Sequence, residues 1–280
     1  MTKSIVSSRY SSPKEAKEAL RGLILLYKDA GEFGINFQPR NDAAFYTPEG
    51  KFVALFLADV FTLAEQDERE AAFAKVKQDL RNRPEVIGRN ARQQLLRNDG
   101  TPTDFVGTPR EVLGKGKSAV YGYYRYKNPQ PGLVKCGLTG PTKDNLELYL
   151  RIVEIEKRIT SIYKHVLPKQ YAEQMKYIDS LLPKWKTEGS AFTTVYALKN
   201  HPCAVHVDKF DIPSATGVLT TTGMFTGNEL CMPEYGIAFD VQPSDILFMD
   251  VHQLHGNFPR TGGDRTSQIY FVRRGMHECK

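Results

Sequence analysis

The sequence predicts an α+β protein in which helices come first and a β-rich core follows. Between residues 142 and 183, apolar residues recur at the spacing of amphipathic helices. From Ala191 to Arg273 the apolar period shortens to two, which is the spacing of half-buried strands. The chain has 280 residues, of which 41% are hydrophobic, so it can bury one sizeable core with a helical extension.

Residues 1–110 are expected to form a mixed helical extension that offers a contact surface for nucleic acid. Ser12 and Pro13 are typical of a helix start, and apolar residues follow them at helical spacing until Gly31. Residues 45–60 are rich in strand-forming side chains and contain a turn signal, which predicts two short strands.

A charged helix is expected next. Thr62 and Glu65 fit a capping box, and the helical pattern that they open ends before Pro84. Glycine and proline then punctuate residues 98–118, which indicates a loop.

Residues 111–280 are expected to form the core together with its supporting helices. A long amphipathic helix is predicted from Thr142 to about Lys164. Pro168 is typical of the first turn of another helix, which should end near Pro183. The strands of the core follow these two helices.

Three residues of the β-rich part form a candidate metal site. His206 and Asp208 are two residues apart, so on a strand their side chains point to the same face. His255 follows a short apolar strand and a turn, and the glycine after it permits close approach of the backbone. Two imidazoles and one carboxylate on one side of a metal, with the other positions open, favour Fe(II) and oxygen chemistry.

Two alternatives compete with this interpretation. His252 follows the same strand as His255, but it lies in the middle of the connection, so we expect it beside the ligands or exposed. The simplest alternative for the whole pattern is a β-sandwich with histidines scattered over its surface. The agreement of residue type, order and spacing favours the metal site.

A cation lies ten residues beyond His255. Arg265 carries a forked guanidinium, which matches the carboxylate of a dicarboxylate co-substrate bound beside the metal. Ser267 is two residues further on, on the same strand face, and can add a hydroxyl to that carboxylate. We therefore expect Arg265 and Ser267 to bind the co-substrate.

Residues 191–273 resemble the double-stranded β-helix core, a jelly-roll and cupin-like fold, of the 2-oxoglutarate/Fe(II) dioxygenases. Within that superfamily they are most similar to the TET/JBP family, and there to the thymine hydroxylase domain of the kinetoplastid J-binding proteins and their phage relatives. The segments that carry the resemblance are Ala191–Val195, His206–Asp208, Gly217–Leu219, Leu230–Tyr235, Asp250–His252 and His255–Asn257. The chain departs from the superfamily pattern at Ser244, where glycine is common.

The resemblance implies a double-stranded β-helix flanked by helices, with Fe(II) as cofactor and 2-oxoglutarate and O₂ as co-substrates. It implies hydroxylation of the C5-methyl group of a pyrimidine in DNA, with thymine (giving 5-hydroxymethyluracil) favoured over 5-methylcytosine. The catalytic set would be His206, Asp208, His255 and Arg265. Three further polar residues either lie near the metal or cap strand ends and turns, and the sequence leaves both open: Asn200, Asp211 and Asn257.

Two other classes of function stay open at this point. One is the same chemistry on a protein side chain or a small molecule. The other is a catalytically silent nucleic-acid-binding module that keeps the fold. Release of succinate and retention on DNA would separate the three.

Positive charge gathers in residues 69–130, which hold 13 Lys and Arg against 6 Asp and Glu, whereas the whole chain carries +6. Basic residues suit phosphates, and the tyrosines interleaved with them suit stacked bases. A solvated helix face beside a tyrosine-rich strand is the alternative. With the family resemblance, we predict that Arg89, Arg92 and Arg97 contact DNA phosphates.

The sequence also bears on compartment and partners. No apolar run approaches the roughly 18–20 residues of a membrane span, and the first residues lack the apolar stretch of a signal peptide. The four cysteines have no C-x-x-C spacing and are expected to be free thiols: Cys136, Cys203, Cys231 and Cys279. We therefore expect a reducing intracellular compartment (the cytoplasm of a bacterium or phage-infected cell, or a nucleus), DNA as partner and no obligate protein partner.

Overall fold

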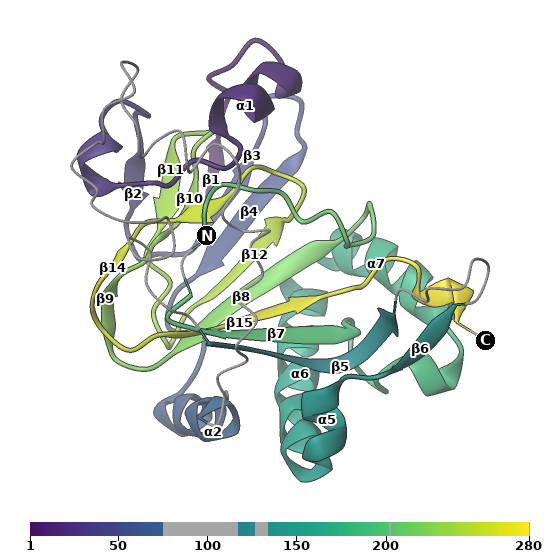
Figure 1. The fold of residues 1–280 in the computed structure, drawn as a ribbon. Coiled ribbons are helices and arrows are strands. Elements are labelled where there is room, and N and C mark those ends of the chain that lie inside the picture. The colour runs from purple at the N-terminus through teal and green to yellow at the C-terminus, as the bar shows by residue number, and fades with distance from the viewer. Residues whose placement is uncertain (75–116, 127–133, 202, 280) are drawn as a thin grey trace, which may run out of the picture.

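The computed structural model of the protein describes residues 1–74, 117–126, 134–201 and 203–279. Two β-sheets pack face to face, and helices cover the outer face of the larger sheet (Figure 1). This arrangement is a double-stranded β-helix flanked by helices, so the predicted fold class is confirmed.

The larger sheet has nine strands within the described residues, in the order β1-β3-β4-β12-β8-β15-β7-β5-β6. Its strands are β1 Thr2–Ile5, β3 Ala43–Tyr46, β4 Phe52–Leu57, β5 Lys117–Tyr126, β6 Lys135–Leu138, β7 Thr194–Lys199, β8 Thr216–Thr222, β12 Ile246–Asp250 and β15 Thr266–Phe271. β1 and β3 pair in parallel, whereas the other neighbours are antiparallel. Every residue of β8 is buried, because helices cover one face of this sheet and the smaller sheet covers the other.

The smaller sheet has the strand order β13-β10-β11-β2. Its strands are β2 Asn36–Gln38, β10 Leu230–Met232, β11 Ile237–Phe239 and β13 Gly256–Asn257, and a separate pair is formed by β9 Phe225–Gly227 and β14 Arg260–Gly263. The ring centroid of Phe239 lies 5.2 Å from that of Phe45 and 5.9 Å from that of Phe56, both on the larger sheet. These aromatic contacts place one apolar core between the two sheets.

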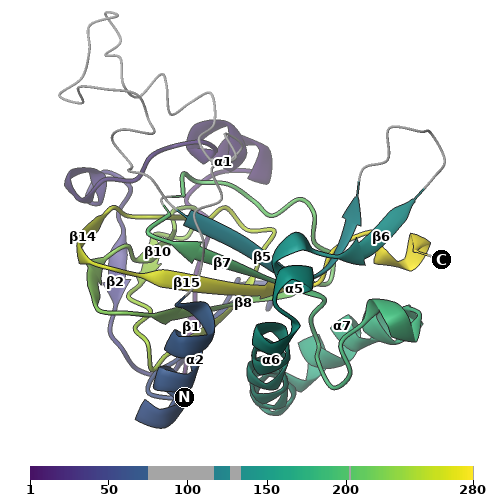
Figure 2. The same cartoon turned by 60° about the horizontal axis from the view of Figure 1, so that its bottom comes forward.

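A second apolar core lies between the larger sheet and its helices (Figure 2). The helices on this side are α2 Leu63–Phe73, α5 Gly140–Asp144, α6 Leu146–Val166 and α7 Pro168–Ser180. The Tyr163 ring of α6 stacks at 5.5 Å from Phe248 and 6.2 Å from Phe192. The predicted capping box is confirmed, because the Thr62 N–H donates to the Glu65 carboxylate at 2.8 Å and the Thr62 hydroxyl accepts from the Glu65 N–H. Among the described helices, none combines the length and apolarity needed to cross a bilayer.

The first helix is shorter than the sequence predicts. α1 spans Pro13–Leu20 and does not continue to Gly31. After it, the Gly22 N–H donates to the Val205 carbonyl at 2.6 Å, and the Val205 N–H donates to the Leu23 carbonyl at 2.8 Å. This extended pairing ends the helix, since these residues satisfy their backbone groups with another segment. Short 3-10 turns occur at η1 Tyr27–Asp29, η2 Pro183–Trp185 and η3 Met276–Glu278.

The N-terminal strands are part of the same sheet as the C-terminal core, which differs from the expected division at residue 110. β4 pairs antiparallel with β12, with Ala54 opposite Met249 and Leu57 opposite Ile246. The two strands predicted within residues 45–60 do form, as β3 and β4. Because β4 is almost wholly buried, it needs a pairing partner on each side, and β12 supplies one of them.

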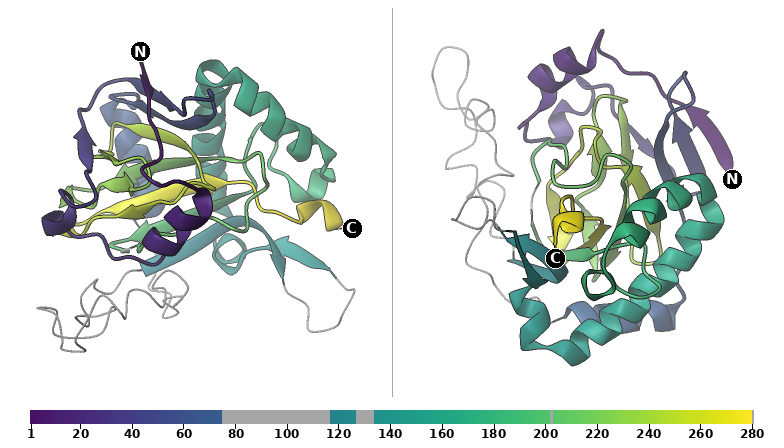
Figure 3. Two further views of the ribbon diagram at one scale, coloured as in Figure 1. Left: turned by 90° about the horizontal axis from the view of Figure 1, so that it is seen from above. Right: turned by 90° about the vertical axis from the view of Figure 1, so that its right-hand side faces the viewer.

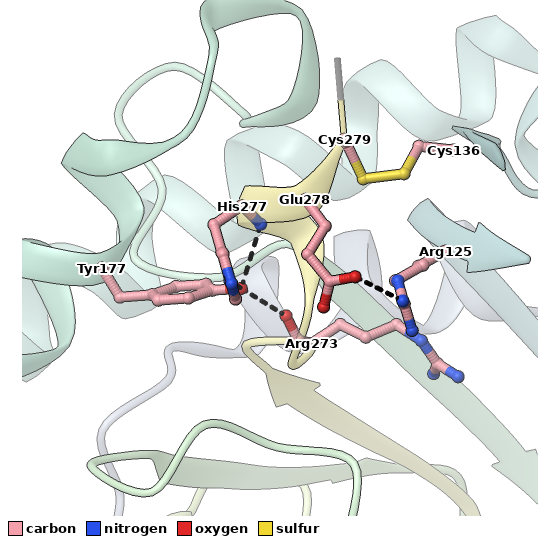
Figure 4. Close-up of a disulfide and its surroundings, with 7 residues drawn as sticks. All are labelled: Arg125, Cys136, Tyr177, Arg273, His277, Glu278 and Cys279. Carbon is pink, nitrogen blue, oxygen red and sulfur yellow. Dashed lines mark hydrogen bonds and ion pairs between the residues drawn. A yellow bond between two sulfur atoms is a disulfide. The ribbon is translucent and has the colours of Figure 1, made fainter. Parts of the chain in front are cut away.

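Two of the four cysteines are paired, so the expectation of four free thiols is wrong. Cys136 on β6 and Cys279 near the C-terminus form a disulfide, with Cα atoms 5.8 Å apart and a separation of 143 positions in sequence (Figure 4). An ion pair of 2.6 Å between Arg125 and Glu278 joins β5, the neighbour of β6, to the same C-terminal segment. The sequence spacing gave no sign of this pairing, because only the fold brings β6 and the C-terminus together. Cys203 and Cys231 are free.

A buried acid lies inside the core between α6 and the larger sheet. Glu156 is fully buried, and neither of its carboxylate oxygens has a hydrogen-bond partner among the described residues. Burial raises the pKa of Glu156 from its ordinary 4.5 to about 8. The folded protein therefore holds a proton there that the unfolded chain releases at lower pH.

The raised pKa of Glu156 makes stability depend on pH. Between about pH 4.5 and 8 the folded state binds more protons than the unfolded state, so the free energy of unfolding falls as pH rises through this window. Glu156→Gln removes the ionisation. We expect it to stabilise the protein by roughly 2–4 kcal/mol more at pH 8.5 than at pH 5, since each pKa unit corresponds to about 1.4 kcal/mol. Denaturant unfolding at both pH values measures this difference. The exposed Glu154→Gln on the same helix is the control, and an equal effect of Glu156→Gln at both pH values would contradict the raised pKa.

Candidate active site

A backbone bridge brings the two histidines together. His206 and His255 form an antiparallel bridge in which each N–H donates to the carbonyl of the other, at 2.8 and 2.9 Å. The Asp208 N–H donates to the Val251 carbonyl at 3.0 Å, which fixes the carboxylate beside them. A Cβ at Gly256 would lie 3.0 Å from the Val205 nitrogen, so the close approach expected at this glycine is present. His206 and Asp208 lie outside the regular strands, in contrast to the strand position that the sequence predicted for them.

The three side chains point their donor atoms at one place. Nε2 of His206 lies 3.5 Å from Oδ1 of Asp208, and Nε2 of His255 lies 3.8 Å from Oδ2. The Nδ1 of His206 lies 2.8 Å from the Ala204 carbonyl, and that of His255 lies 2.9 Å from the Gln253 carbonyl. Each Nδ1 therefore carries the hydrogen, which leaves the Nε2 lone pair for a metal.

The electrostatics of the cluster suit a metal as well. Burial and the nearby His206 together lower the pKa of His255 to about 4, so this imidazole is neutral at neutral pH. Burial opposes ionisation of Asp208, but its hydrogen bond to His206 and the electrostatic effect of the neighbouring imidazoles outweigh burial and lower the pKa of Asp208. Burial opposes the charged form of His206, but its hydrogen bond to Asp208 and the charge of that carboxylate raise the pKa of His206. Two imidazole nitrogens and one carboxylate fit Fe(II), with further coordination positions open.

His252 lies apart from this cluster. It follows β12 in a turn, with its Nδ1 3.2 Å from Oδ1 of Asp250, and its backbone N–H also donates to that oxygen at 3.0 Å. Among the described residues, the group that could hold a metal consists of His206, Asp208 and His255. The structure thus places His252 beside the site and does not place it among the candidate ligands.

A cavity of about 920 Å³ opens beside the three donor atoms, and all three side chains line it. The lining is apolar over much of its area, with residues of β8, β10 and β12 contributing, and Ser267 and Asn257 add polar groups. This volume lies in the upper range of ligand-binding pockets, which is roughly 300–1,000 Å³. The cavity is large enough to hold a small co-substrate together with part of a second bound molecule.

Arg265 is a buried cation with unused donors. It directly precedes β15 and is 3% exposed. One of its guanidinium nitrogens donates to the Asn228 side chain, whereas Nε and Nη2 have no hydrogen-bond partner among the described residues. Burial lowers the pKa of Arg265 to about 10, which leaves it charged at neutral pH. Unmatched donors on a buried charge are costly, so they fit an anionic ligand such as a carboxylate.

The other polar groups singled out in the sequence have different positions. Asn200 accepts from the Arg265 backbone N–H at 2.8 Å and donates to Asp264 at 2.7 Å, so it holds the turn before β15. Asp211 and Asn257 line the cavity. Burial raises the pKa of Asp211 well above its ordinary value.

Several cavity residues gave no signal in the sequence, although Tyr124 belongs to the tyrosine-rich segment whose rings were expected to suit stacked bases. The Arg273 guanidinium lies 3.8 Å from the ring centroid of Tyr124 and 5.7 Å from that of Phe210, and all three line the cavity. Lys17 and Arg21 of the α1 region line it too. The α1 region lies far in sequence from Tyr124, Phe210 and Arg273, so no local pattern links these cavity residues. Arg89, Arg92 and Arg97 lie outside the described residues.

The donor geometry predicts the effect of removing one ligand. Asp208→Ala should abolish Fe(II) binding and leave the fold intact, because a partly exposed carboxylate at a cavity wall contributes little packing. Isothermal titration of the apoprotein with Fe(II) under anaerobic conditions measures this, and His252→Ala is the control expected to bind normally. Normal binding by Asp208→Ala together with loss of binding by His252→Ala would reverse the ligand assignment.

Known proteins similar to this chain identify its family. The Tet_JBP family model, described as the oxygenase domain of the 2OGFeDO superfamily, matches residues 119–274. The thymine dioxygenase JBP1-A of Trypanosoma cruzi is 28% identical over 168 residues, which cover 58% of this chain and 20% of that protein. The bifunctional helicase and thymine dioxygenase JBP2 of Leishmania tarentolae is 27% identical over 239 residues, which cover 84% of this chain and 20% of that protein.

A solved structure shares the fold over most of its length. The structure of NgTET1 in complex with 5mC DNA aligns with a TM-score of 0.58 at 15% identity and covers 89% of each chain. The present chain spans about one fifth of the length of the two J-binding relatives. Because the family model covers more than half of the chain, the protein belongs to the TET/JBP oxygenase family of the 2-oxoglutarate/Fe(II) dioxygenase superfamily.

Proposed function

We propose that the protein is a 2-oxoglutarate- and Fe(II)-dependent dioxygenase that hydroxylates the C5-methyl group of a pyrimidine in DNA. Thymine is the favoured base over 5-methylcytosine, and 5-hydroxymethyluracil is the product. The observation that carries this proposal is the cluster of His206, Asp208 and His255 on the wall of a cavity in a TET/JBP oxygenase domain.

The reaction consumes one 2-oxoglutarate and one O₂ per methyl group and releases succinate and CO₂. One oxygen atom enters succinate and the other enters the methyl group as its hydroxyl. When bound, Fe(II) with these co-substrates supplies the oxidising power for an unactivated C–H bond. The protein supplies three ligands, and Arg265 and Ser267 bind the distal carboxylate of 2-oxoglutarate.

The walls of the cavity suit a pyrimidine. Tyr124 presents an aromatic ring on which the target base can stack. Arg273 has only donors, and thymine offers an acceptor oxygen at position 4 where 5-methylcytosine has an amine. This chemistry and the names of the J-binding relatives, which are thymine dioxygenases, support thymine.

A DNA polymer as substrate has two supports. The NgTET1 structure that shares the fold is a complex with DNA. The segment 69–130 has an excess of positive charge, and phosphate contacts by Arg89, Arg92 and Arg97 remain part of the proposal. A base inside a duplex has to leave the stack, or be met single-stranded, to reach a metal inside a cavity.

The role of Arg265 is tested by its removal. Arg265→Ala should weaken 2-oxoglutarate by about 2–4 kcal/mol, which is roughly 30- to 1000-fold in Michaelis constant, because a bidentate charged contact is lost. Arg265→Lys keeps the charge without the forked guanidinium, so its Michaelis constant for 2-oxoglutarate should lie between those of the wild type and Arg265→Ala. Arg260→Ala, an exposed arginine in the same segment, is the matched control. An unchanged Michaelis constant for 2-oxoglutarate in Arg265→Ala would remove this role.

The substrate is tested by a side-by-side assay. Oligonucleotides with thymine or with 5-methylcytosine are incubated with Fe(II) and 2-oxoglutarate, and their nucleosides are measured by mass spectrometry. We expect 5-hydroxymethyluracil to dominate, since a pocket that bonds one edge leaves a polar group unpaired with the other. Dominant 5-hydroxymethylcytosine would overturn the base preference only. Succinate without an oxidised base would favour a protein or small-molecule substrate, and no succinate would indicate a silent module.

A further inference from the structure

Three exposed cations surround the mouth of the cavity. Lys17 and Arg21 come from the α1 region, and Lys209 directly follows the candidate ligand Asp208. We call these three residues the basic rim. Glu18 also lines the cavity, and its carboxylate lies 3.9 Å from the ammonium of Lys14.

The fold fixes the basic rim relative to the metal ligands. Lys17 and Arg21 are four residues apart, so they lie on the same side of α1 and the turn that ends it. The chain after Arg21 is hydrogen-bonded on both sides to Val205, the residue before His206. Ala16 and Leu20 pack in one apolar cluster with Val205, which holds the helix against this segment. The two cations are therefore positioned by the same segment that carries the first metal ligand.

An exposed aromatic ring lies within the same rim. Phe210 follows Lys209, lines the cavity and is 55% exposed. An exposed aromatic ring at a cavity offers a stacking surface, and a nucleic-acid base is a flat partner that stacks on such a ring. Cations beside an exposed ring are the combination found in grooves that bind a single strand.

We propose that the basic rim binds the phosphates on either side of the target nucleotide while its base enters the cavity. Each nucleotide in a strand has a phosphate on both sides, so cations on two segments can hold the strand at the mouth. Phe210 then stacks on a base next to the target. This inference rests on the proposed nucleic-acid substrate and names the residues that hold the strand.

The salt dependence of binding tests the basic rim. We expect Lys17→Gln/Arg21→Gln to flatten the slope of log K against log salt by about 1.4 units on single strands and about 1.8 on duplex. Affinity at about 0.1 M salt should fall by a factor of several tens. Fluorescence anisotropy with a thymine-containing oligonucleotide over a series of salt concentrations measures both quantities, and it requires no turnover.

Matched variants separate charge from structure. Lys164→Gln/Lys169→Gln removes the same charge from α6 and α7, which lie on the opposite side of the molecule from α1, and it should keep the wild-type slope (Figure 3). Lys17→Arg/Arg21→Lys preserves both charges and should keep the slope as well. Phe210→Ala should lower affinity for single strands without changing the slope, because it carries no charge.

The outcomes distinguish this inference from the proposed function. Wild-type slope and affinity in Lys17→Gln/Arg21→Gln, with an unchanged melting temperature, would overturn the basic rim even where the wild type oxidises DNA. If the wild type binds DNA with the predicted losses in the variants but oxidises no base, the rim stands and the proposed reaction fails. If the wild type binds no nucleic acid, both fail. A preference of the rim for an acidic peptide over DNA in the same titration would overturn it too.

Discussion

The candidate site depends on one pair of backbone hydrogen bonds, those between His206 and His255. Each residue donates its N–H to the carbonyl of the other, at 2.8 and 2.9 Å, so the two imidazoles start from adjacent points on neighbouring segments. The same pairing continues on one side to Asp208, whose N–H reaches the Val251 carbonyl. On the other side Val205 pairs with the chain after α1. The metal donors and the basic rim are therefore set by the same run of backbone bonds.

Two buried ionisable side chains, Arg265 and Glu156, have polar atoms without hydrogen-bond partners among the described residues, and the consequences differ. Arg265 keeps two unpaired donors in a buried position two residues before Ser267, which lines the cavity, and unpaired donors on a buried charge fit an anionic ligand. Glu156 has unpaired carboxylate oxygens on the helical side of the larger sheet. Burial raises the pKa of Glu156, so the side chain stays protonated at pH values well above its ordinary pKa. The first charge is an expected binding determinant, whereas the second makes stability depend on pH.

The two ends of the chain close the fold around the central strands. β3 and β4 extend the larger sheet beyond β12, and the disulfide of Cys136 with Cys279 ties the other edge of that sheet to the C-terminus. Arg273 lies shortly before Cys279 in sequence and contacts the Tyr124 ring on β5, the strand next to β6. The cavity wall that faces the proposed base is thus built from segments that the C-terminal connection holds together.

The sequence by itself determined features that depend on neighbours along the chain. Local backbone preference determines the capping box of Thr62 and Glu65 and the period-two strands after Ala191. The spacing of His206 and Asp208, together with the segments around them, was enough to predict the family. Only the tertiary structure decided which distant segments meet. The pairing of β4 with β12, the end of α1 beside Val205 and the disulfide partner of Cys136 each join residues separated by more than a hundred positions. Such choices depend on packing and backbone pairing across the whole core, and no local pattern in the chain encodes them.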